Sequence, residues 1–508
     1  MTGSPRSVTV SVTGRSTWGS RLLTPIEYNL FLMAAAPSSA LVVPAARTMP
    51  SPTEPDAKLA AGVARRILSD VVDRGWPVGE VLGSQAQLIE RYGVSRAVFR
   101  EAVRLVENQQ VATMRRGPGG GLVVSEPTVD AIIDAAVLYL HRANTRLTEV
   151  FEARIVLEVI AAELATERLT EDDAIELRAL EEQEVRDHRA LHARLAALTR
   201  NPALELFVDI LNRVVLLYFR DGSSLGEGTL SASREAHARI IEAVLDHNAD
   251  AASRRMRRHL EAESAFLQNR NVSRQFLSRS VALGGGVSNK RAEDVARAIL
   301  QDVVADDLPP GTLLGSQAAL IERYGASRAV FREALRLLEH HQIATMRRGP
   351  GGGLFVSAPS VRGVSDVVAV YLARRGISVA DLVELRIRVE LAQVELAIDR
   401  GVGLSELHGA LEHEDKLSLG EFADGGHDLH AVIAGLTGNR ALELVSLVLI
   451  RLMRLHQIEE VSDEERALAA LEVSKAHGAI AAAITEGNAA LARRRMRRHL
   501  EALGRYLR

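Results

Sequence analysis

Histidines are the residues of this chain with the clearest potential for chemistry. His188 and His192 are four positions apart, which places them on one face of a helix, where two imidazoles can share a metal ion. His237 and His259 follow on later helices, 22 residues apart. Four imidazoles form a donor set that suits zinc or nickel. The alternative is that these histidines are satisfied polar residues inside a helical bundle.

The same histidine spacing recurs in the second half of the chain. His477 and His499 are again 22 residues apart, and His430 precedes them. Three imidazoles with open positions bind a metal more weakly unless a ligand or water completes the shell. We therefore expect a divalent metal in the first set more than in the second.

Arginines form the second pattern. Arg96, Arg100 and Arg104 follow one another at intervals of four, so they share one face of a helix. Residues 83–116 contain six arginines and three glutamates, although the whole chain has a formal net charge of -3. A guanidinium is a fork of donors that fits guanine edges or phosphates. The plain alternative is a solvated charged face.

An internal duplication weighs against that plain alternative. Residues 83–125 match residues 315–357 at 35 of 43 positions, and all six arginines recur. Similarity falls beyond this segment and returns at "MRRHLEA", which begins at Met256 and again at Met496. The chain is therefore two tandem copies of a two-part unit, and the repeated arginines favour binding to DNA.

A second polar pair also recurs. Arg154 and Glu158 are repeated as Arg386 and Glu390. An arginine inside a bundle pocket is a natural fork for the carboxylate of an organic acid, so Arg154 and Arg386 are candidate ligand-binding residues. The alternative is an i,i+4 pair on a wet helix surface, which contributes only a few tenths of a kcal/mol.

The elements that carry the arginines are readable from the pattern. The spacing of apolar residues predicts a first helix with an apolar face formed by Leu59, Val63, Ile67, Leu68 and Val71. A second helix is predicted from Ser84, which forms a capping-box pattern with Gln87, to Gly93, and a third begins at Ser95. Residues 111–116 and 122–125 predict two strands joined by "GPGGG". A helix-turn-helix followed by a β-hairpin wing results.

Helical patterns run through residues 128–269 and again from about residue 360, without a convincing strand. The predicted fold is mainly α, with two winged helix-turn-helix domains, each followed by an all-α helical bundle. Asn201 and Asn439 are predicted helix caps. The expected domains are an extension (1–56), winged helix 1 (57–126), bundle 1 (127–277), a linker (278–289), winged helix 2 (290–358) and bundle 2 (359–508).

Composition narrows the class of protein. The 508 residues are 47% hydrophobic and 25% charged, as in ordinary globular proteins. There is no cysteine, which removes disulfides, thiolate metal sites and cysteine nucleophiles. The first fifty residues faintly resemble a secretory signal that prolines interrupt, and we expect a disordered extension there, with Met49 as an alternative start. A cytoplasmic location is expected.

The stretch "LGSQAQLIERYGVSRAVFREAV", followed by the glycine-rich wing, resembles the winged helix of the GntR superfamily of bacterial transcription regulators, and the bundles resemble the ligand-binding domain of its FadR-like branch. Alanines at positions 86 and 318 depart from the arginine that this family often has early in the second helix. The resemblance implies that the wings at 115–119 and 347–351 and the starts of the third helices contact DNA. The implied contacts are Ser95, Arg96, Ala97, Val98, Arg100, Arg115, Arg116, Gly117, Ser327, Arg328, Ala329, Val330, Arg332, Arg347, Arg348 and Gly349.

The resemblance also implies a metal in the bundles, because relatives in this branch hold a divalent ion with one aspartate and three histidines. The three histidines would be His192, His237 and His259 in the first bundle and His430, His477 and His499 in the second. The aspartate is missing from both copies. His188 stands at its place in the first copy and Gly426 in the second.

The expected function is that of a transcription regulator, not an enzyme. Its expected partners are double-stranded DNA with a two-fold or repeated operator and a small effector, an organic acid by preference. Two readers on one chain form a built-in pseudo-dimer, and further homodimerisation stays open. The alternatives are a metal-dependent hydrolase, for which no paired acid and base is readable, and a DNA-architectural protein without a ligand.

Overall fold

A computed structural model describes residues 54–115, 117, 119–125, 128–183, 190–216, 227–269, 290–347, 349, 351–401, 404–417, 429–455 and 463–504. The expected linker at 278–289 and nearly all of the expected extension at 1–56 lie outside these residues, as do Arg116, His188, Arg348 and Gly426.

The first winged unit (winged unit 1, residues 54–125) is a helix-turn-helix with a small sheet. Its antiparallel strands have the order β1-β3-β2. The sequence predicted the hairpin of β2 and β3 but not β1, whose three residues are too few to show an alternating pattern. The elements are α1 (Glu54–Asp73), β1 (Val81–Gly83), α2 (Gln85–Tyr92), α3 (Arg96–Asn108), β2 (Ala112–Arg115) and β3 (Gly121–Val124).

Local chemistry sets the ends of α2 and α3 as predicted. The Ser84 hydroxyl accepts a hydrogen bond from the Gln87 amide, and the Gln87 side chain accepts one from the Ser84 amide, which confirms the capping box. Gly93 ends α2 in the left-handed conformation, with φ of 64°, which glycine adopts without strain. Ser95 then caps α3 by accepting from the Val98 amide. The tight turn between the two helices follows from these contacts.

The second winged unit (winged unit 2, residues 290–357) repeats this arrangement with the strand order β4-β6-β5. The same buried phenylalanine position anchors both cores, Phe99 in winged unit 1 and Phe331 in winged unit 2. The elements are α11 (Lys290–Ala305), β4 (Leu313–Gly315), α12 (Gln317–Arg323), α13 (Arg328–His340), β5 (Ala344–Arg347) and β6 (Gly353–Val356).

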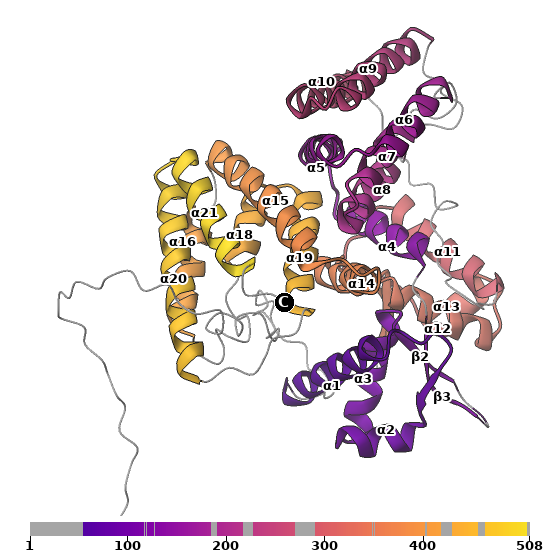
Figure 1. Cartoon of the computed structure of the whole chain (residues 1–508). Helices are drawn as coiled ribbons and strands as arrows, with labels where there is room; N and C mark the ends of the chain where they lie inside the picture. Colours follow the sequence, from indigo (N-terminus) through magenta and orange to yellow (C-terminus); the bar gives the residue numbers. More distant parts are fainter. Residues whose placement is uncertain are drawn as a thin grey trace, which may run out of the picture.

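Each winged unit is followed by a helical bundle, and the described parts of both bundles contain no strand, as predicted. Bundle 1 (129–269) comprises α4 (Val129–Arg142), α5 (Leu147–Glu167), α6 (Glu171–Gln183), α7 (Ala190–Leu198), α8 (Pro202–Leu216), α9 (Glu227–Leu245) and α10 (Ala249–Asn269). Bundle 2 (361–504) comprises α14 (Val361–Arg374), α15 (Val379–Arg400), α16 (Leu404–Glu414), α18 (Leu429–Leu436), α19 (Arg440–Leu455), α20 (Asp463–Thr485) and α21 (Ala489–Gly504). The mainly α fold is confirmed (Figure 1).

The two bundles share one hydrophobic core. A single cluster of buried side chains includes Leu157 and Phe207 of bundle 1 together with Leu372 and Leu449 of bundle 2. Helix α4 packs on α14, and α5 packs on α15 and α19. Burial of apolar surface on this scale makes the bundles one body rather than two tethered domains.

Two asparagines reinforce this seam in matching ways. Asn201 accepts from the backbone amides at the start of α8, and its side-chain nitrogen donates to the Asp381 carbonyl of bundle 2 at 2.9 Å. Asn439 caps α19 likewise, and its side chain donates to the Glu149 carbonyl of bundle 1 at 2.8 Å. Both predicted caps are confirmed, and each also joins the two halves.

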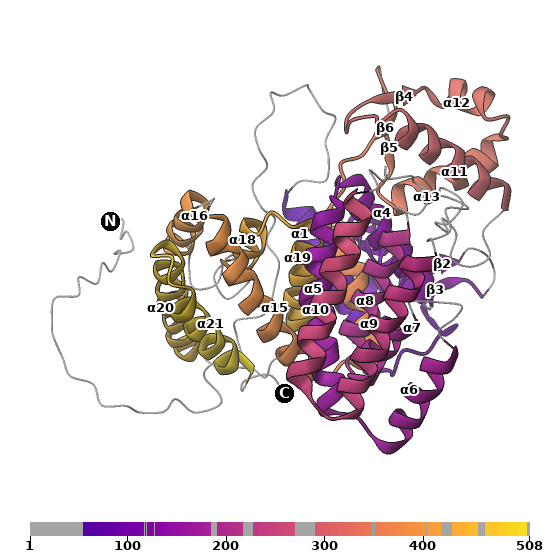
Figure 2. The ribbon, with the colours of Figure 1, turned by 90° about the horizontal axis from the view of Figure 1, so that it is seen from above.

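The winged units pack on the bundles in a crossed manner. Leu138 of α4, in bundle 1, belongs to the core of winged unit 2, whereas Val370 of α14, in bundle 2, belongs to the core of winged unit 1. Figure 1 shows α4 beside α11 and α13, and Figure 2 shows the same neighbours from above. Arg142, in the last turn of α4, donates to the carbonyls of Gln342, at 2.5 Å, and Ser357 in winged unit 2. Each bundle therefore contacts the winged unit of the other half.

Among the described helices, none combines the length and the apolar character that crossing a bilayer requires.

Candidate nucleic-acid interface and candidate metal centres

The predicted arginine face is exposed in both winged units. Arg96, Arg100 and Arg104 lie on the outer side of α3, and their counterparts Arg328, Arg332 and Arg336 lie on the outer side of α13. Arg104 pairs with Glu101 at 3.8 Å, and Arg336 with Glu333 at 2.8 Å. Within the described part of the chain, Arg96 and Arg100 form no ion pair, so their guanidinium groups are available to a partner.

Two of the residues implied as DNA contacts have other tasks in winged unit 1. Val98 is buried in the core beside Phe99, because it lies on the inner face of α3, so its side chain does not reach the outer surface. The Ser95 hydroxyl is engaged as a helix cap, at 3.2 Å from the Val98 amide. In winged unit 2, Ser327 caps α13 in the same way and Val330 is partly buried. Ala97 and Ala329 are exposed.

The wings present arginine beside glycine. Arg115 and Arg347 are exposed at the ends of β2 and β5, and Arg347 lies over the ring of Phe355, 4.4 Å from its centroid. Gly117 has a φ of 105°, and a side chain added there would meet no atom within 4 Å. Gly349 is similar. Space beyond the wing tip, with little side-chain bulk, allows a phosphate backbone to approach closely.

Three buried histidines converge in bundle 1. His192 of α7, His237 of α9 and His259 of α10 each offer a ring nitrogen, and these atoms lie within 4.8 Å of one another. The Nε2 atoms of His237 and His259 are 3.0 Å apart. The Nδ1 of His192 is hydrogen-bonded to Glu158, which leaves its Nε2 for the shared space. His188 lies outside the described residues, so the expected fourth imidazole has no described position.

Bundle 2 repeats the centre with a further carboxylate. His430 of α18, His477 of α20 and His499 of α21 converge in the same way. His430 Nδ1 lies 2.5 Å from Glu390, and its Nε2 lies 3.2 Å from that of His499. His477 Nδ1 lies 3.0 Å from each oxygen of Glu414. The expectation that favoured the first set depended on His188, which lies outside the described residues, so it stays a prediction.

Both triads fit a divalent metal. Burial, followed by the positive charges of His430 and Arg386, holds the pKa of His477 well below its ordinary range, and His499 is shifted in the same direction, first by burial. Neutral imidazole is the form that binds metal. Burial alone would raise the pKa of Glu158 and Glu390, but Arg154 and His192, or Arg386 and His430, outweigh it and lower both to about 2. A carboxylate on the far ring nitrogen orients a metal-binding histidine.

The recurring arginines are buried, not on a wet surface. Arg154 Nε donates to Glu158 Oε1 at 2.6 Å, and Arg386 Nε donates to Glu390 Oε1 at 2.5 Å. Both arginines are at most 3% exposed. The sequence identified these i,i+4 pairs. It did not show that the same glutamates contact His192 and His430, because those histidines are 34 and 40 positions away.

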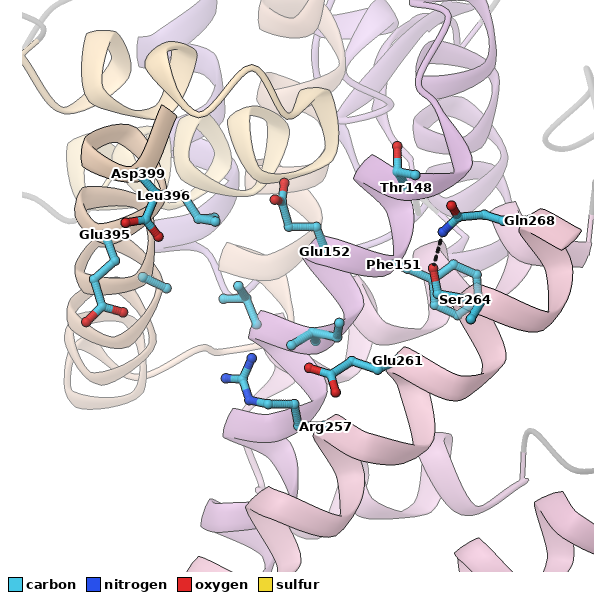
Figure 3. A pocket seen from close by; sticks show the side chains of 14 residues that line it. Thr148, Phe151, Glu152, Arg257, Glu261, Ser264, Gln268, Glu395, Leu396 and Asp399 are labelled. Carbon is cyan, nitrogen blue, oxygen red and sulfur yellow. Dashed lines mark hydrogen bonds between the residues drawn. The ribbon is translucent and has the colours of Figure 1, made fainter. Parts of the chain in front are cut away.

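A groove lies at the seam of the bundles, apart from the histidines. It has a volume of about 660 Å³ and lies between α5 and α10 of bundle 1 and α15 of bundle 2. Figure 3 shows Arg257 and Glu261 on one side of it and Glu395 and Asp399 on the other. A second groove, of about 610 Å³, is lined in part by Arg388, which pairs with Glu163 at 2.9 Å. Val156 stands at the equivalent position in the first groove. No side chain implied as a DNA or metal contact lines either groove.

Comparison with known families decides the class. The model of the bacterial regulatory proteins of the gntR family matches residues 291–356, which form winged unit 2. The model of the FCD domain matches residues 149–262 and again 381–502, the two bundles. The chain belongs to the GntR family. Its FCD domain is duplicated, and winged unit 1 is a second copy of the matched GntR segment, with 35 of 43 positions identical between residues 83–125 and 315–357.

Similar GntR-family proteins are transcription regulators by name. The chain is 27% identical over 223 residues to the Exu regulon transcriptional regulator of Escherichia coli (strain K12), covering 42% of this chain and 84% of that one. It is 26% identical over 204 residues to the HTH-type transcriptional regulator LutR of Bacillus subtilis (strain 168), covering 38% and 90%. A solved structure, Streptococcus agalactiae GntR, aligns with a TM-score of 0.32 and 27% identity, covering 41% of this chain and 99% of that one.

Proposed function

We propose that this chain is a sequence-specific DNA-binding transcription regulator that carries both half-site readers on one polypeptide. One observation carries the proposal. The first arginines of α3 and of α13 are exposed in both copies, and Arg96 and Arg100 have no ion-pair partner among the described residues. The names of the similar proteins, all regulators of transcription, agree with it.

The helix and the wing of each winged unit have different proposed roles. The N-terminal turn of α3 or α13 enters the major groove, where Arg96 and Arg328 offer guanidinium forks to guanine edges. Arg115 and Arg347 on the wings are placed to neutralise phosphates, which sets position and affinity but not sequence. Since the exposed residues of the two helices are alike, both winged units should prefer the same half-site sequence.

The bundles are the proposed sensors. His192, His237 and His259 would hold one divalent metal ion, and His430, His477 and His499 a second. When bound, such an ion supplies a Lewis-acidic position at which an anionic metabolite can complete the coordination shell. Binding in a bundle needs to change the free energy of DNA binding by only about 1 to 3 kcal/mol to act as a switch.

The crossed packing gives that switch a route. Bundle 1 reaches winged unit 2 through Leu138 and Arg142 of α4, and bundle 2 reaches winged unit 1 through Val370 of α14. A shift of α4 caused by ligand in bundle 1 would therefore move winged unit 2. The sensor in each half acts on the reader of the other half.

Selection of bound fragments from random duplexes tests the proposal. The full chain should enrich a sequence with two copies of one half-site, and the double variant R96A/R328A should lose affinity for it, because both base-reading forks are gone. The matched control is R178A/R494A, which removes two exposed arginines from the bundles and should bind as the wild type does. Unchanged affinity of R96A/R328A for the selected fragment would refute the proposed interface.

A further inference from the structure

Two grooves at the seam of the bundles are related by the duplication. The groove drawn in Figure 3 (groove 1) is lined by α5 and α10 of bundle 1 and by α15 of bundle 2. The second groove (groove 2) is lined by α15 and α21 of bundle 2 and by Glu163 of α5. Arg257 lines groove 1, and its counterpart in the repeat, Arg497, lines groove 2. The contacts of the two grooves can therefore be compared position by position.

In groove 2, an arginine of the chain itself binds the carboxylates. Arg388 of α15 pairs across the seam with Glu163, at 2.9 Å, and with Glu167, at 3.8 Å. These two glutamates are one turn apart on α5, and the several donors of one guanidinium suit such a pair. The other carboxylate of the lining, Glu384, pairs with Arg168 at 2.7 Å. Both carboxylates that line groove 2 are thus compensated.

Groove 1 repeats the two carboxylates without the arginine. Glu395 and Asp399 of α15 are the counterparts of the two glutamates, and Val156 of α5 stands where groove 2 has Arg388. Glu395 has one ion pair, with Arg493, and both side chains of that pair are nearly half-exposed, so it contributes little. Asp399 has no ion pair among the described residues. Groove 1 therefore presents the same pair of carboxylates without the cation that groove 2 supplies.

The rest of the lining suits an organic cation. Groove 1 is lined by four carboxylates and one guanidinium, that of Arg257, whereas groove 2 is lined by two of each. Ile155 and Leu396 add apolar surface. Arg497 lines groove 2 together with Arg388, so the equivalent Arg257 does not prevent a second cation from entering groove 1. The volume of about 660 Å³ lies within the range of about 300 to 1,000 Å³ that is usual for small-molecule sites.

We propose that groove 1 binds a small organic cation, a guanidinium or primary ammonium group on an alkyl chain, and that in groove 2 the side chain of Arg388 fills the equivalent place. The cationic group lies between Glu395 and Asp399 and donates hydrogen bonds to both carboxylates. Its alkyl chain packs on Val156. The site is separate from the two histidine triads, whose side chains line neither groove.

Occupation of groove 1 affects both halves of the chain, because its walls belong to both bundles. A bound cation adds an attraction between α15 and α5 that the described side chains of groove 1 lack and that Arg388 supplies in groove 2. The change reaches the winged units through α4 and α14, which contact them. This regulatory step rests on the proposed function, whereas the binding itself does not.

Exchange of the two deciding residues, 156 and 388, tests the inference in the full chain. The probe is radiolabelled agmatine, an alkyl chain with a guanidinium at one end and an ammonium at the other, and binding is measured by equilibrium dialysis at physiological ionic strength. The wild type should bind one agmatine per chain, and R388V should bind two. V156R and D399N should bind at least about tenfold more weakly, the effect of losing one charged hydrogen-bonded contact. Butylurea, an uncharged analogue of an alkylguanidine, should not compete.

I175R and E486Q are the matched controls. I175R adds the same positive charge as V156R at an exposed position of bundle 1 outside both grooves. E486Q removes an exposed carboxylate of bundle 2 that lines neither groove. Both should bind agmatine as the wild type does. Circular dichroism melting identifies any variant that fails to fold, and if V156R is one of them, D399N and R388V decide the outcome.

Absence of saturable agmatine binding to the wild type, or equal binding to wild type, V156R and D399N, would overturn the inference. A loss in I175R as large as that in V156R, or a single site in R388V, would overturn it as well. Failure of the proposed function has a different signature. In that case agmatine binds as described, but neither agmatine nor the R96A/R328A change alters affinity for DNA.

Discussion

At the scale of single residues, Glu158 and Glu390 are buried carboxylates that need compensating partners. Each is 1% exposed, and each accepts from an arginine through one oxygen and from a histidine through the other. A buried charge is stable only when such partners compensate for lost hydration. Each of these two glutamates therefore joins a buried arginine to a histidine of the proposed metal centre.

Replacing Glu158 by glutamine in metal-free protein should reduce the free energy of unfolding by roughly 3 kcal/mol at neutral pH, because Arg154 loses a buried charged partner. The pKa of Glu158 is lowered from 4.5 to about 2 in the folded chain. A lowered carboxyl pKa stabilises the fold above the ordinary pKa, and this contribution is lost as the pH falls toward the folded value. The difference between wild type and E158Q should therefore shrink below pH 4.5, as measured by denaturant unfolding.

The matched variant E390Q provides a comparison. Arg386 has no second carboxylate partner among the described residues, whereas Arg154 retains Glu263. E390Q should therefore destabilise the chain more than E158Q does. Equal effects, or a difference from wild type that does not depend on pH, would contradict the assigned pairing.

For the histidines, we predict the metal content of the purified protein. Protein purified without chelator should contain close to one zinc or nickel ion for each triad by elemental analysis. H237A should lower the content by one ion and H477A should do the same in the other bundle, since each variant removes one of three donors. H247A changes an exposed histidine and is the control. Wild-type protein without bound metal, or H237A and H477A with as much metal as H247A, would refute the centres.

The sequence predicted the histidines and the arginines of the site but not the partners that orient them. His237 and His259 could be found because their spacing recurs. Glu263 could not, because Leu503 stands at its place in the other copy. Glu414 could not either, because a glutamate on a helical face is usually solvated. For Val98, the resemblance implied a contact with DNA, but its side chain is buried on the inner face of α3.

At the scale of elements, α4 is the connection between sensor and reader. Arg142 donates from its last turn to two backbone carbonyls of winged unit 2, and burial lowers the pKa of Arg142 to about 10. Hydrogen bonds from a charged donor are each worth about 1.5 to 3 kcal/mol. The helix is therefore fixed to the winged unit of the other half.

Replacing Arg142 by methionine should loosen winged unit 2 selectively, because methionine cannot replace the two hydrogen bonds. Amide hydrogen exchange should increase in residues 290–357 and stay unchanged in residues 54–125. R146M, which changes an exposed arginine just before α5, is the control. Equal acceleration in both winged units would show that the crossed contact does not hold winged unit 2.

Local signals predicted most elements of the winged units. The periodicity gave α1, in which Val63, Ile67 and Val71 are buried as expected, and the Ser84 pattern gave the start of α2. Leu59 was predicted on the apolar face but is 55% exposed, because the buried stripe of α1 begins at its neighbour Ala60. The crossed packing has no local signal, since it depends on contacts more than 150 positions apart.

At the scale of the whole molecule, the shared core makes the two halves one folding body. Cutting the chain in the expected linker, at a protease site inserted within residues 278–289, should therefore leave the halves associated. The cut protein should elute in size-exclusion chromatography at the volume of the intact chain. Separation of the halves without denaturant would contradict the shared core.

The same cut protein tests the two seam asparagines. N201A/N439A removes the three hydrogen bonds that these two side chains donate across the seam, and it should weaken association of the cut halves. Its control is N248A/N488A, which removes two helix caps within the bundles and leaves the seam intact. Both doubles lose about 1 kcal/mol for each cap, so only the first should separate the halves on dilution.

The seam also differs from that of any pair of identical chains. In a symmetric homodimer, each residue of the contact appears on both sides, so every substitution is made twice. Here Arg388 faces Glu163 and Glu167 in one half, while Val156 stands at its place in the other. Covalent fusion removes the requirement for self-complementarity. One half of the chain can therefore change its contacts, and its chemistry, without the same change occurring in the other half.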